Sequence, residues 1–142
     1  MQLEIPALGV KTPLVGVAKS DNGWDLSWLW NQVGYLGGTA FPTWAGNSVV
    51  TGHAYLPNGK SGPFVNLGNL GYGSKVVVHA WGQRYIYEVR SVERVQPDDL
   101  RILKHEELPW LTLLTCQGFD EAKGTYRWRL AVKAVQVKVE AE

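Results

Sequence analysis

Cysteine is almost absent from this chain of 142 residues, and Cys116 is the only one. A single cysteine excludes an intrachain disulfide, so packing and hydrogen bonds alone must hold the fold. Long hydrophobic runs are also missing: no stretch of about 18 apolar residues occurs, which excludes a membrane-spanning helix within this sequence. We therefore expect membrane attachment only through an anchor that is not present in this chain.

Charge is scarce and nearly balanced. Fourteen Lys and Arg against thirteen Asp and Glu leave a formal net charge of +1. Nucleic-acid binding normally needs a strongly basic face, so we expect no nucleic-acid partner. Hydrophobic residues make up 45% and charged residues 19%, which is a globular composition. We predict a single domain over residues 1–142, long enough to bury a core.

Short β-rich runs, separated by Gly, Pro and Asn, dominate the pattern. Strands are predicted at residues 3–5, 12–17, 47–55, 75–81, 84–95, 110–116 and 126–139, with a hairpin turn at Gly82-Gln83. Weaker helical signals lie at residues 25–33 and 63–70 and at Pro97. The chain is therefore expected to be all-β, with seven or eight short strands in a closed or nearly closed barrel.

Cys116 ends the apolar run over residues 112–116. Strand alternation places Thr112, Leu114 and Cys116 on one face, and a loop is predicted to begin at Gln117. A lone free cysteine is often a small buried hydrophobe. A thiol at the end of a strand can instead act as a nucleophile, provided that a base or a positive group lies near it.

His53 is the histidine best suited to be that base. It closes the valine-rich run over residues 49–53 and follows Gly52, where another backbone can approach closely. This setting suits a general acid or base. His79 lies inside a strand and is predicted to be structural, whereas His105 lies in a polar segment and is predicted to be solvated.

A strand arginine is the third part of the predicted site. A guanidinium near a thiol can donate hydrogen bonds to a developing oxyanion and stays charged at every working pH. Arg127 and Arg129 share one parity along the strand, so periodicity alone leaves both as candidates.

Three motifs in order resemble the sortases, the cysteine transpeptidases of bacterial cell surfaces. They are Thr51-Gly52-His53, then Thr112-Leu113-Leu114-Thr115-Cys116, then Arg129-Leu130-Ala131-Val132. The second matches the family pattern Thr-Leu-x-Thr-Cys at every fixed position. The resemblance favours Arg129 over Arg127, because the family arginine directly precedes a Leu-Val-Val-like run. It covers nearly the whole chain and implies a closed eight-stranded β-barrel with short helices and long loops.

The resemblance also implies a two-step acyl transfer. Cys116 attacks a carbonyl within a sorting signal similar to Leu-Pro-x-Thr-Gly, and an amine then takes the acyl group from the thioacyl enzyme. The sorting signals belong to surface proteins, and the amine belongs to a peptidoglycan precursor or a pilin-like lysine. His53 is expected to act as acid and base, Arg129 to hold the oxyanion and the signal's backbone, and Thr115 to contact the substrate. The expected location is extracytoplasmic, at the surface of a bacterium.

No cofactor is expected. The segment over residues 95–109 contains Asp98, Asp99, Glu106 and Glu107, and acids here bind calcium in one branch of the family. Because scattered loop acids are far more often solvated, we predict no metal site. Two other functions remain open: a thiol peptidase that releases the free acid, and a non-catalytic carbohydrate- or peptide-binding β-domain with an inert Cys116.

Tryptophan is abundant, with seven in the chain, of which Trp24, Trp28, Trp30 and Trp44 cluster early. We expect them to pack in the core and over the barrel ends, because each buries a large apolar area. The functional alternative is an exposed aromatic platform for a sugar or a peptide.

Overall fold

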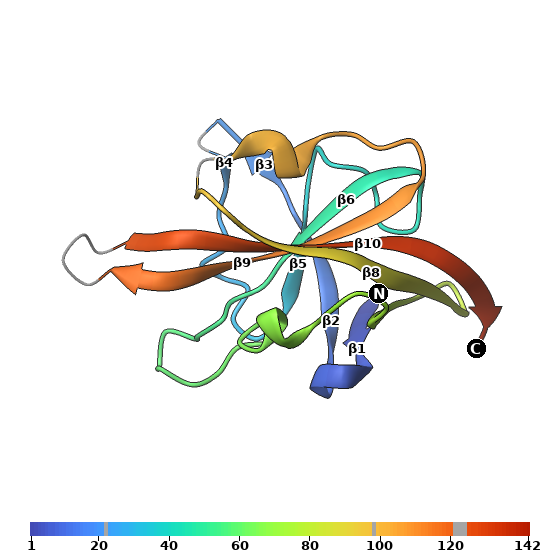
Figure 1. The fold of residues 1–142 in the computed structure, drawn as a ribbon, viewed down its shortest axis with the longest axis horizontal. Helices are drawn as coiled ribbons and strands as arrows, with labels where there is room; N and C mark the ends of the chain where they lie inside the picture. Colours follow the sequence, from blue (N-terminus) through green and yellow to red (C-terminus); the bar gives the residue numbers. More distant parts are fainter. Residues whose placement is uncertain (22, 98, 121–124) are drawn as a thin grey trace.

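The computed structural model describes residues 1–21, 23–97, 99–120 and 125–142, with the backbone alone for residues 100, 116–120 and 125–127 (Figure 1). The strands are β1 Gln2–Ile5, β2 Val10–Val17, β3 Lys19–Ser20, β4 Gly23–Trp24, β5 Val33–Leu36, β6 Gly46–Thr51, β7 Lys75–Ala80, β8 Gln83–Val95, β9 Pro109–Asp120 and β10 Thr125–Ala141. Three short 3-10 helices are η1 Pro6–Leu8, η2 Leu67–Asn69 and η3 Leu100–Leu103.

Eight strands close into a barrel in the order β1-β2-β5-β6-β9-β10-β8-β7, and β3 pairs with β4 in a separate ribbon. The predicted closed eight-stranded barrel is therefore confirmed. Most neighbours are antiparallel, but β2 and β5 run parallel, as do β6 and β9. Thr51 opposite Leu114 is the last pair of the β6–β9 ladder. Beside them, β10 and β9 run antiparallel, with Arg129 opposite Cys116.

The barrel has a large interior core and a smaller apolar cluster on its outer face. Along β10, Leu130 and Val132 belong to the interior core, while Ala131 between them belongs to the outer cluster. This alternation follows from the two-residue period of a strand. The outer cluster, which includes Leu36, Val49 and Leu114, is covered by four side chains from two crossing segments: Trp24, Leu26, Ile102 and Leu103.

The predicted helical stretch over residues 25–33 is wrong. The Asp25 carboxylate accepts hydrogen bonds from the backbone N–H and the hydroxyl of Ser27, which closes a local turn in place of a helix start. Trp30 has a φ of 56°, in the left-handed region, and a right-handed helix cannot pass through that conformation. Side chain-to-backbone hydrogen bonding thus overrides the weak helical spacing here.

Several element boundaries also differ from the prediction. β6 ends at Thr51, so His53 lies two residues beyond the strand, and β9 continues past Cys116 to Asp120. The β7–β8 turn consists of Trp81 and Gly82, one residue earlier than predicted. The third helical signal, at Pro97, corresponds to η3, which begins at Leu100 with Asp99 as its N-cap.

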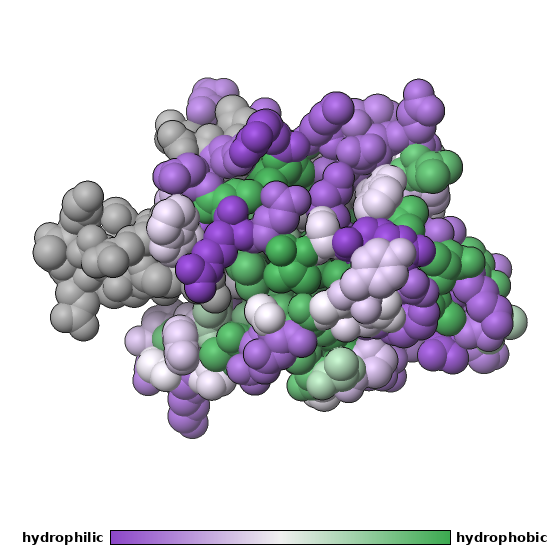
Figure 2. Space-filling model, viewed as in Figure 1, coloured by the Kyte–Doolittle hydropathy of each residue, from purple (hydrophilic) through white to green (hydrophobic). Residues whose placement is uncertain are grey.

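Polar and apolar side chains are mixed over the surface drawn in Figure 2, where apolar atoms gather near the middle and polar atoms form most of the rim. Within the part of the chain that the structure describes, no helix has the length and hydrophobicity needed to cross a membrane.

Candidate active site

The three predicted site residues lie on or just beyond three adjacent strands. His53 lies two residues beyond Thr51, where β6 ends, and Cys116 lies two residues beyond Leu114 on the parallel strand β9. Arg129 is the register partner of Cys116 on β10, at the spacing of about 5 Å between paired strands. The barrel topology therefore brings these three positions, from separate parts of the sequence, to neighbouring places on the sheet.

Cys116 is described through its backbone alone. Its side chain lies outside the described part of the structure, so its role as nucleophile stays a prediction. The register does fix its neighbours: directly opposite residues of an antiparallel ladder lie on the same face, and here the opposite residue is Arg129.

His53 is held at both its backbone and its ring. Its carbonyl accepts a hydrogen bond from the N–H of Phe64 at 3.1 Å. Gly62 lies so close that an added Cβ would be 2.3 Å from that carbonyl oxygen. The ring Nε2 is 2.9 Å from the carbonyl oxygen of Leu26. Because a carbonyl only accepts, Nε2 carries the proton in this arrangement.

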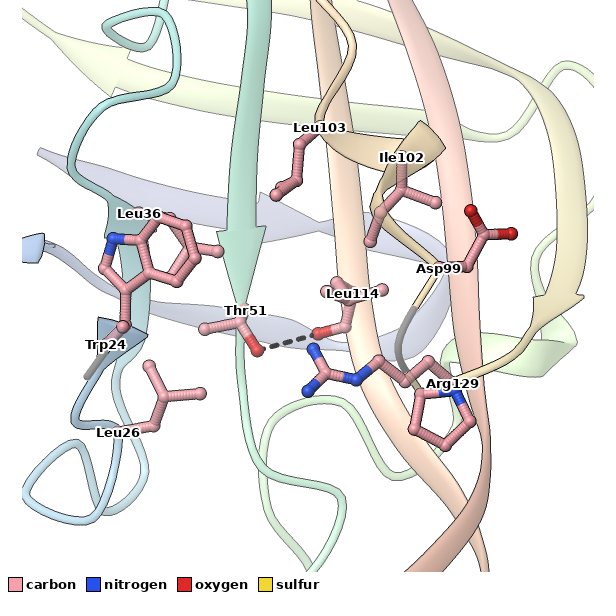
Figure 3. Close-up of a pocket in the computed structure, with 11 residues that line it drawn as sticks. Trp24, Leu26, Leu36, Thr51, Asp99, Ile102, Leu103, Leu114 and Arg129 are labelled. Atoms are coloured by element: carbon pink, nitrogen blue, oxygen red, sulfur yellow. Dashed lines mark hydrogen bonds between the residues drawn. The ribbon is translucent and has the colours of Figure 1, made fainter. Parts of the chain in front are cut away.

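Arg129 extends its guanidinium across a cavity on the outer face of the barrel. In Figure 3 the guanidinium points towards Thr51 and Leu114, and the carboxylate of Asp99 lies beside Ile102, on the same side of the cavity as the Arg129 backbone. Its Nε is buried, and among the described residues it has no hydrogen-bond partner. A buried donor of this kind is costly to leave unpaired, so it is suited to an acceptor on a bound molecule.

Two threonines link the strands just before His53 and Cys116. The Thr51 hydroxyl donates to the carbonyl of Leu114 at 3.0 Å, and the Thr115 hydroxyl donates to the carbonyl of Gly52 at 2.9 Å. Both side chains are buried. Thr115 therefore contacts the protein itself and does not line the cavity that Arg129 enters. A substrate contact by Thr115 stays a prediction.

The cavity has a volume of about 260 Å³ and a largely apolar lining. Its lining residues are Gly23, Trp24, Leu26, Leu36, Thr51, Pro97, Asp99, Ile102, Leu103, Leu114 and Arg129. Its floor is the outer face of the barrel, and its walls are the segment around β4 on one side and the segment containing η3 on the other (Figure 3). We call it the outer groove. Such a site can hold an extended peptide that carries an apolar side chain.

Asn47 anchors the η3 wall of the outer groove. Its buried amide donates to the carbonyl of Ile102 at 2.7 Å and accepts from the hydroxyl of Thr112 at 2.7 Å. Asp99 caps the same helix by accepting from the N–H and the guanidinium of Arg101. Those hydrogen bonds lower the pKa of Asp99 to about 2. The wall is thus tied to the barrel and capped by an ionised carboxylate.

Two of the four acids considered for calcium, Asp99 and Glu106, have other partners. Asp98 is outside the described residues, Asp99 is paired with Arg101, and Glu106 is paired with Lys133 at 3.2 Å. Over the described parts of the chain, no group of three or more His, Cys, Asp or Glu side chains is placed to hold a metal ion.

Sequence reasoning missed the residues that support the site. In the sequence, Asn47 is simply a polar residue at the start of a predicted strand, and Thr51 is an ordinary β-branched residue within it. Only the pairing of β6 with β9, which are about 60 residues apart in sequence, shows what their side chains bind. The groove wall formed by Trp24 and Leu26 was also missed, because residues 25–33 were predicted to form a helix.

Comparison with known proteins agrees with this barrel fold. The family model described as Sortase domain matches residues 3–137. Sortase C-1 from Actinomyces oris is 30% identical with a TM-score of 0.78, covering 96% of this chain and 72% of its own. Sortase C1 from Streptococcus agalactiae is 30% identical with a TM-score of 0.77, covering 96% and 66%. A lid mutant of sortase A from Corynebacterium diphtheriae is 27% identical with a TM-score of 0.78, covering 98% and 70%. Comparison with curated protein sequences found no match.

The chain belongs to the sortase family. The family and fold imply a cysteine transpeptidase, and members of this family act at the bacterial cell surface. The chain spans 72%, 66% and 70% of the length of these three solved relatives.

Proposed function

We propose that this protein cleaves a sorting signal similar to Leu-Pro-x-Thr-Gly, forms a thioacyl enzyme at Cys116 and passes the acyl group to an amine. The observation that carries the proposal is the relation between Arg129 and Cys116. They are register partners, and Arg129 offers a buried N–H that lacks an acceptor among the described residues. A donor fixed beside the reacting carbonyl stabilises negative charge only as that charge develops.

In the first step the Cys116 thiolate attacks the threonine carbonyl of the signal. The carbonyl π electrons move to oxygen, and Arg129 stabilises the resulting oxyanion. The intermediate then collapses: the C–N bond breaks, His53 gives a proton to the leaving amine of glycine, and a thioester remains.

In the second step an acceptor amine attacks the thioester carbonyl. The C–S bond breaks, His53 takes the proton of the incoming amine, and the thiolate is regenerated. The acceptor that we propose is an amine of a peptidoglycan precursor or a pilin-like lysine. Since His53 serves once as acid and once as base, its placement beside the groove residue Leu26 matters in both steps.

The outer groove supports an apolar residue in the signal. Leu36 and Leu114 form a buried apolar floor, and Trp24 and Ile102 stand on either side. An extended peptide placed along this floor brings its backbone to Arg129 at one end of the groove. The groove chemistry therefore agrees with a leucine a few residues before the scissile bond.

Peptides of the form Leu-Pro-x-Thr-Gly, varied at x, test this proposal when mixed with the protein and excess triglycine. An amide product between the threonine and triglycine supports transpeptidation. A product that is always the free acid favours a thiol peptidase. If none of the peptides is cleaved, both enzymatic functions are contradicted and a non-catalytic binding domain is favoured.

Substitutions at the predicted catalytic residues test the role of each one. Cys116→Ala is expected to abolish transfer, and His53→Ala and Arg129→Ala to lower kcat/KM by roughly 10²–10⁴-fold. Arg127→Ala serves as the matched control on the same strand and is expected to lose far less. Equal losses for Arg127→Ala and Arg129→Ala would overturn the choice of arginine.

A further inference from the structure

The ring of His53 is held by the segment of chain that follows β4. Its Nε2 lies 2.9 Å from the carbonyl oxygen of Leu26, which is 27 residues earlier in the chain. A carbonyl only accepts hydrogen bonds, so Nε2 is a protonated nitrogen. In a neutral imidazole the other nitrogen, Nδ1, then has the free lone pair. The Leu26 carbonyl therefore decides which ring atom of His53 is left to exchange protons.

The Leu26 carbonyl belongs to a peptide unit that is held at its opposite end by Asp25. That planar unit also contains the N–H of Ser27, and in a trans peptide the C=O and the N–H point in opposite directions. One carboxylate oxygen of Asp25 accepts from this N–H at 3.0 Å and from the Ser27 hydroxyl at 2.6 Å. Because Asp25 fixes the N–H, it also fixes the direction of the carbonyl that meets His53.

The same carbonyl is tied to the barrel through Leu29. The N–H of Leu29 donates to the Leu26 carbonyl at 3.1 Å. The Leu29 side chain is fully buried, and an added Cβ at Gly34 on β5 would lie 3.1 Å from it. Its neighbours Trp28 and Trp30 are 50% and 44% exposed, contrary to the core packing expected for them. One buried leucine thus anchors the turn, and the second lone pair of the carbonyl remains for the histidine ring.

Asp25 can act on the reaction only indirectly. Its side chain is exposed, and the described lining of the outer groove includes its neighbours Trp24 and Leu26 but not Asp25 itself (Figure 3). The hydrogen bonds from Ser27 lower the pKa of Asp25, so the carboxylate is an ionised acceptor at neutral pH. A substitution at Asp25 leaves the groove side chains in place, so its effect must pass through the backbone that Asp25 holds or through its charge.

We propose that Asp25 is a positioning residue for the proton transfers of His53. By holding the Leu26–Ser27 peptide unit, it keeps His53 in the Nε2–H tautomer with one ring orientation. In the first step the imidazolium gives its Nδ1 proton to the nitrogen of the leaving amine. In the second step the neutral Nδ1 takes a proton from the incoming amine, and Nε2–H stays bonded to Leu26 throughout. The effect on rate rests on the acyl transfer proposed above, whereas the choice of tautomer does not.

A histidine that is free to change tautomer or to rotate spends part of its time without a basic nitrogen at the reacting amine. Two substitutions separate hydrogen bonding by Asp25 from its charge. Asp25→Asn keeps an oxygen acceptor in the same place and removes the charge. Asp25→Glu keeps the charge and moves the acceptor by one methylene. The proposal predicts that Asp25→Asn behaves like the unaltered protein and that Asp25→Glu behaves like Asp25→Ala.

Imidazole ¹⁵N NMR of histidine-labelled protein reads the tautomer without any substrate. At alkaline pH, where histidine is neutral, the unaltered protein and Asp25→Asn are expected to show the Nε2–H tautomer of His53. Asp25→Ala and Asp25→Glu are expected to show a mixture of both tautomers. The signals of His53 are identified by their loss in His53→Ala.

Transfer to triglycine gives the second measurement. Asp25→Ala and Asp25→Glu are expected to lower kcat roughly tenfold or more, with KM for the peptide unchanged, because part of the contribution of proton transfer is lost. Asp25→Asn is expected to retain most of the kcat. Asp21→Ala is the matched control, since it removes the same charge from an exposed position between β3 and β4, and it is expected to react normally. Circular dichroism and urea midpoints show that each variant is folded.

An Nδ1–H tautomer in the unaltered protein overturns the proposal, as does an Asp25→Ala variant with unchanged tautomer and kcat. Losses in Asp25→Asn equal to those in Asp25→Ala, with Asp25→Glu unaffected, overturn it in favour of a charge effect. A rise in KM alone overturns it in favour of a contribution to the groove wall. If the unaltered protein transfers no peptide while the tautomer still depends on Asp25, the proposed function fails and the positioning of His53 by Asp25 is supported.

Discussion

The hydroxyl of Thr115 donates a hydrogen bond to the carbonyl of Gly52, 2.9 Å away on the neighbouring strand. The bond lies one residue beyond the last paired position of β6 and β9. It therefore holds the strands together where each continues into a predicted catalytic residue, His53 on one side and Cys116 on the other.

Thr115→Val is expected to destabilise the fold by about 1–3 kcal/mol, because it leaves the buried carbonyl of Gly52 without its donor. Urea unfolding measures the loss. Thr115→Ser is the matched control, since it keeps the hydroxyl and should retain both stability and transfer activity. Equal losses in the two variants would show that the methyl group and not the hydrogen bond matters.

Gly62→Ala is expected to displace His53. The added Cβ would meet the His53 carbonyl oxygen at 2.3 Å, so the backbone must shift, at a cost of about 1–3 kcal/mol. Transfer activity should fall together with stability. Gly71→Ala is the control, because an added Cβ there meets nothing within 4 Å. Normal activity in Gly62→Ala would contradict the tight placement of His53.

Asn47→Ala is expected to raise KM for the sorting-signal peptide more than it lowers kcat. The substitution removes the donor to Ile102 and the acceptor for Thr112, and so releases the η3 wall of the outer groove. Steady-state kinetics with varied peptide concentration give both constants. A pure loss of kcat with unchanged KM would show that this wall does not bind the peptide.

The lowered pKa of Asp99 predicts that its contribution to stability depends on pH. Its pKa in the folded protein is about 2, below the ordinary value of 3.8, because Arg101 donates hydrogen bonds to the carboxylate. A lowered pKa means that its contribution to stability is present above pH 3.8 and is lost as the pH falls through about 2. An NMR titration of the carboxyl group in the unaltered protein and in Arg101→Ala measures the shift. An ordinary pKa in both proteins would contradict the capping of η3.

The barrel was predictable because most of its strands are regular. The runs at residues 75–81 and 84–95 alternate clearly and contain β-branched side chains, so their pattern and their final structure agree to within a residue or two. β5 was missed because it is four residues long and contains Gly34, which weakens any strand signal.

The sequence offered candidate site residues, and whether they are catalytic stays a prediction, but it did not offer their arrangement. Motif order pointed to His53 and Arg129, yet only the barrel order reveals that β6, β9 and β10 are neighbours. The exposure of Trp44 was not predicted either: its ring packs on the nearby Phe41, and the other face of that small cluster comes from Trp81, about 40 residues further along the chain.

Intact-protein mass spectrometry tests the central claim most directly. A Leu-Pro-x-Thr-Gly peptide library is mixed with the protein in the absence of an added amine, and the reaction is quenched with acid. The account predicts an added mass equal to the peptide up to its threonine, located on Cys116 and lost on adding triglycine. Peptide cleavage by Cys116→Ala, or an adduct on another residue, would contradict it.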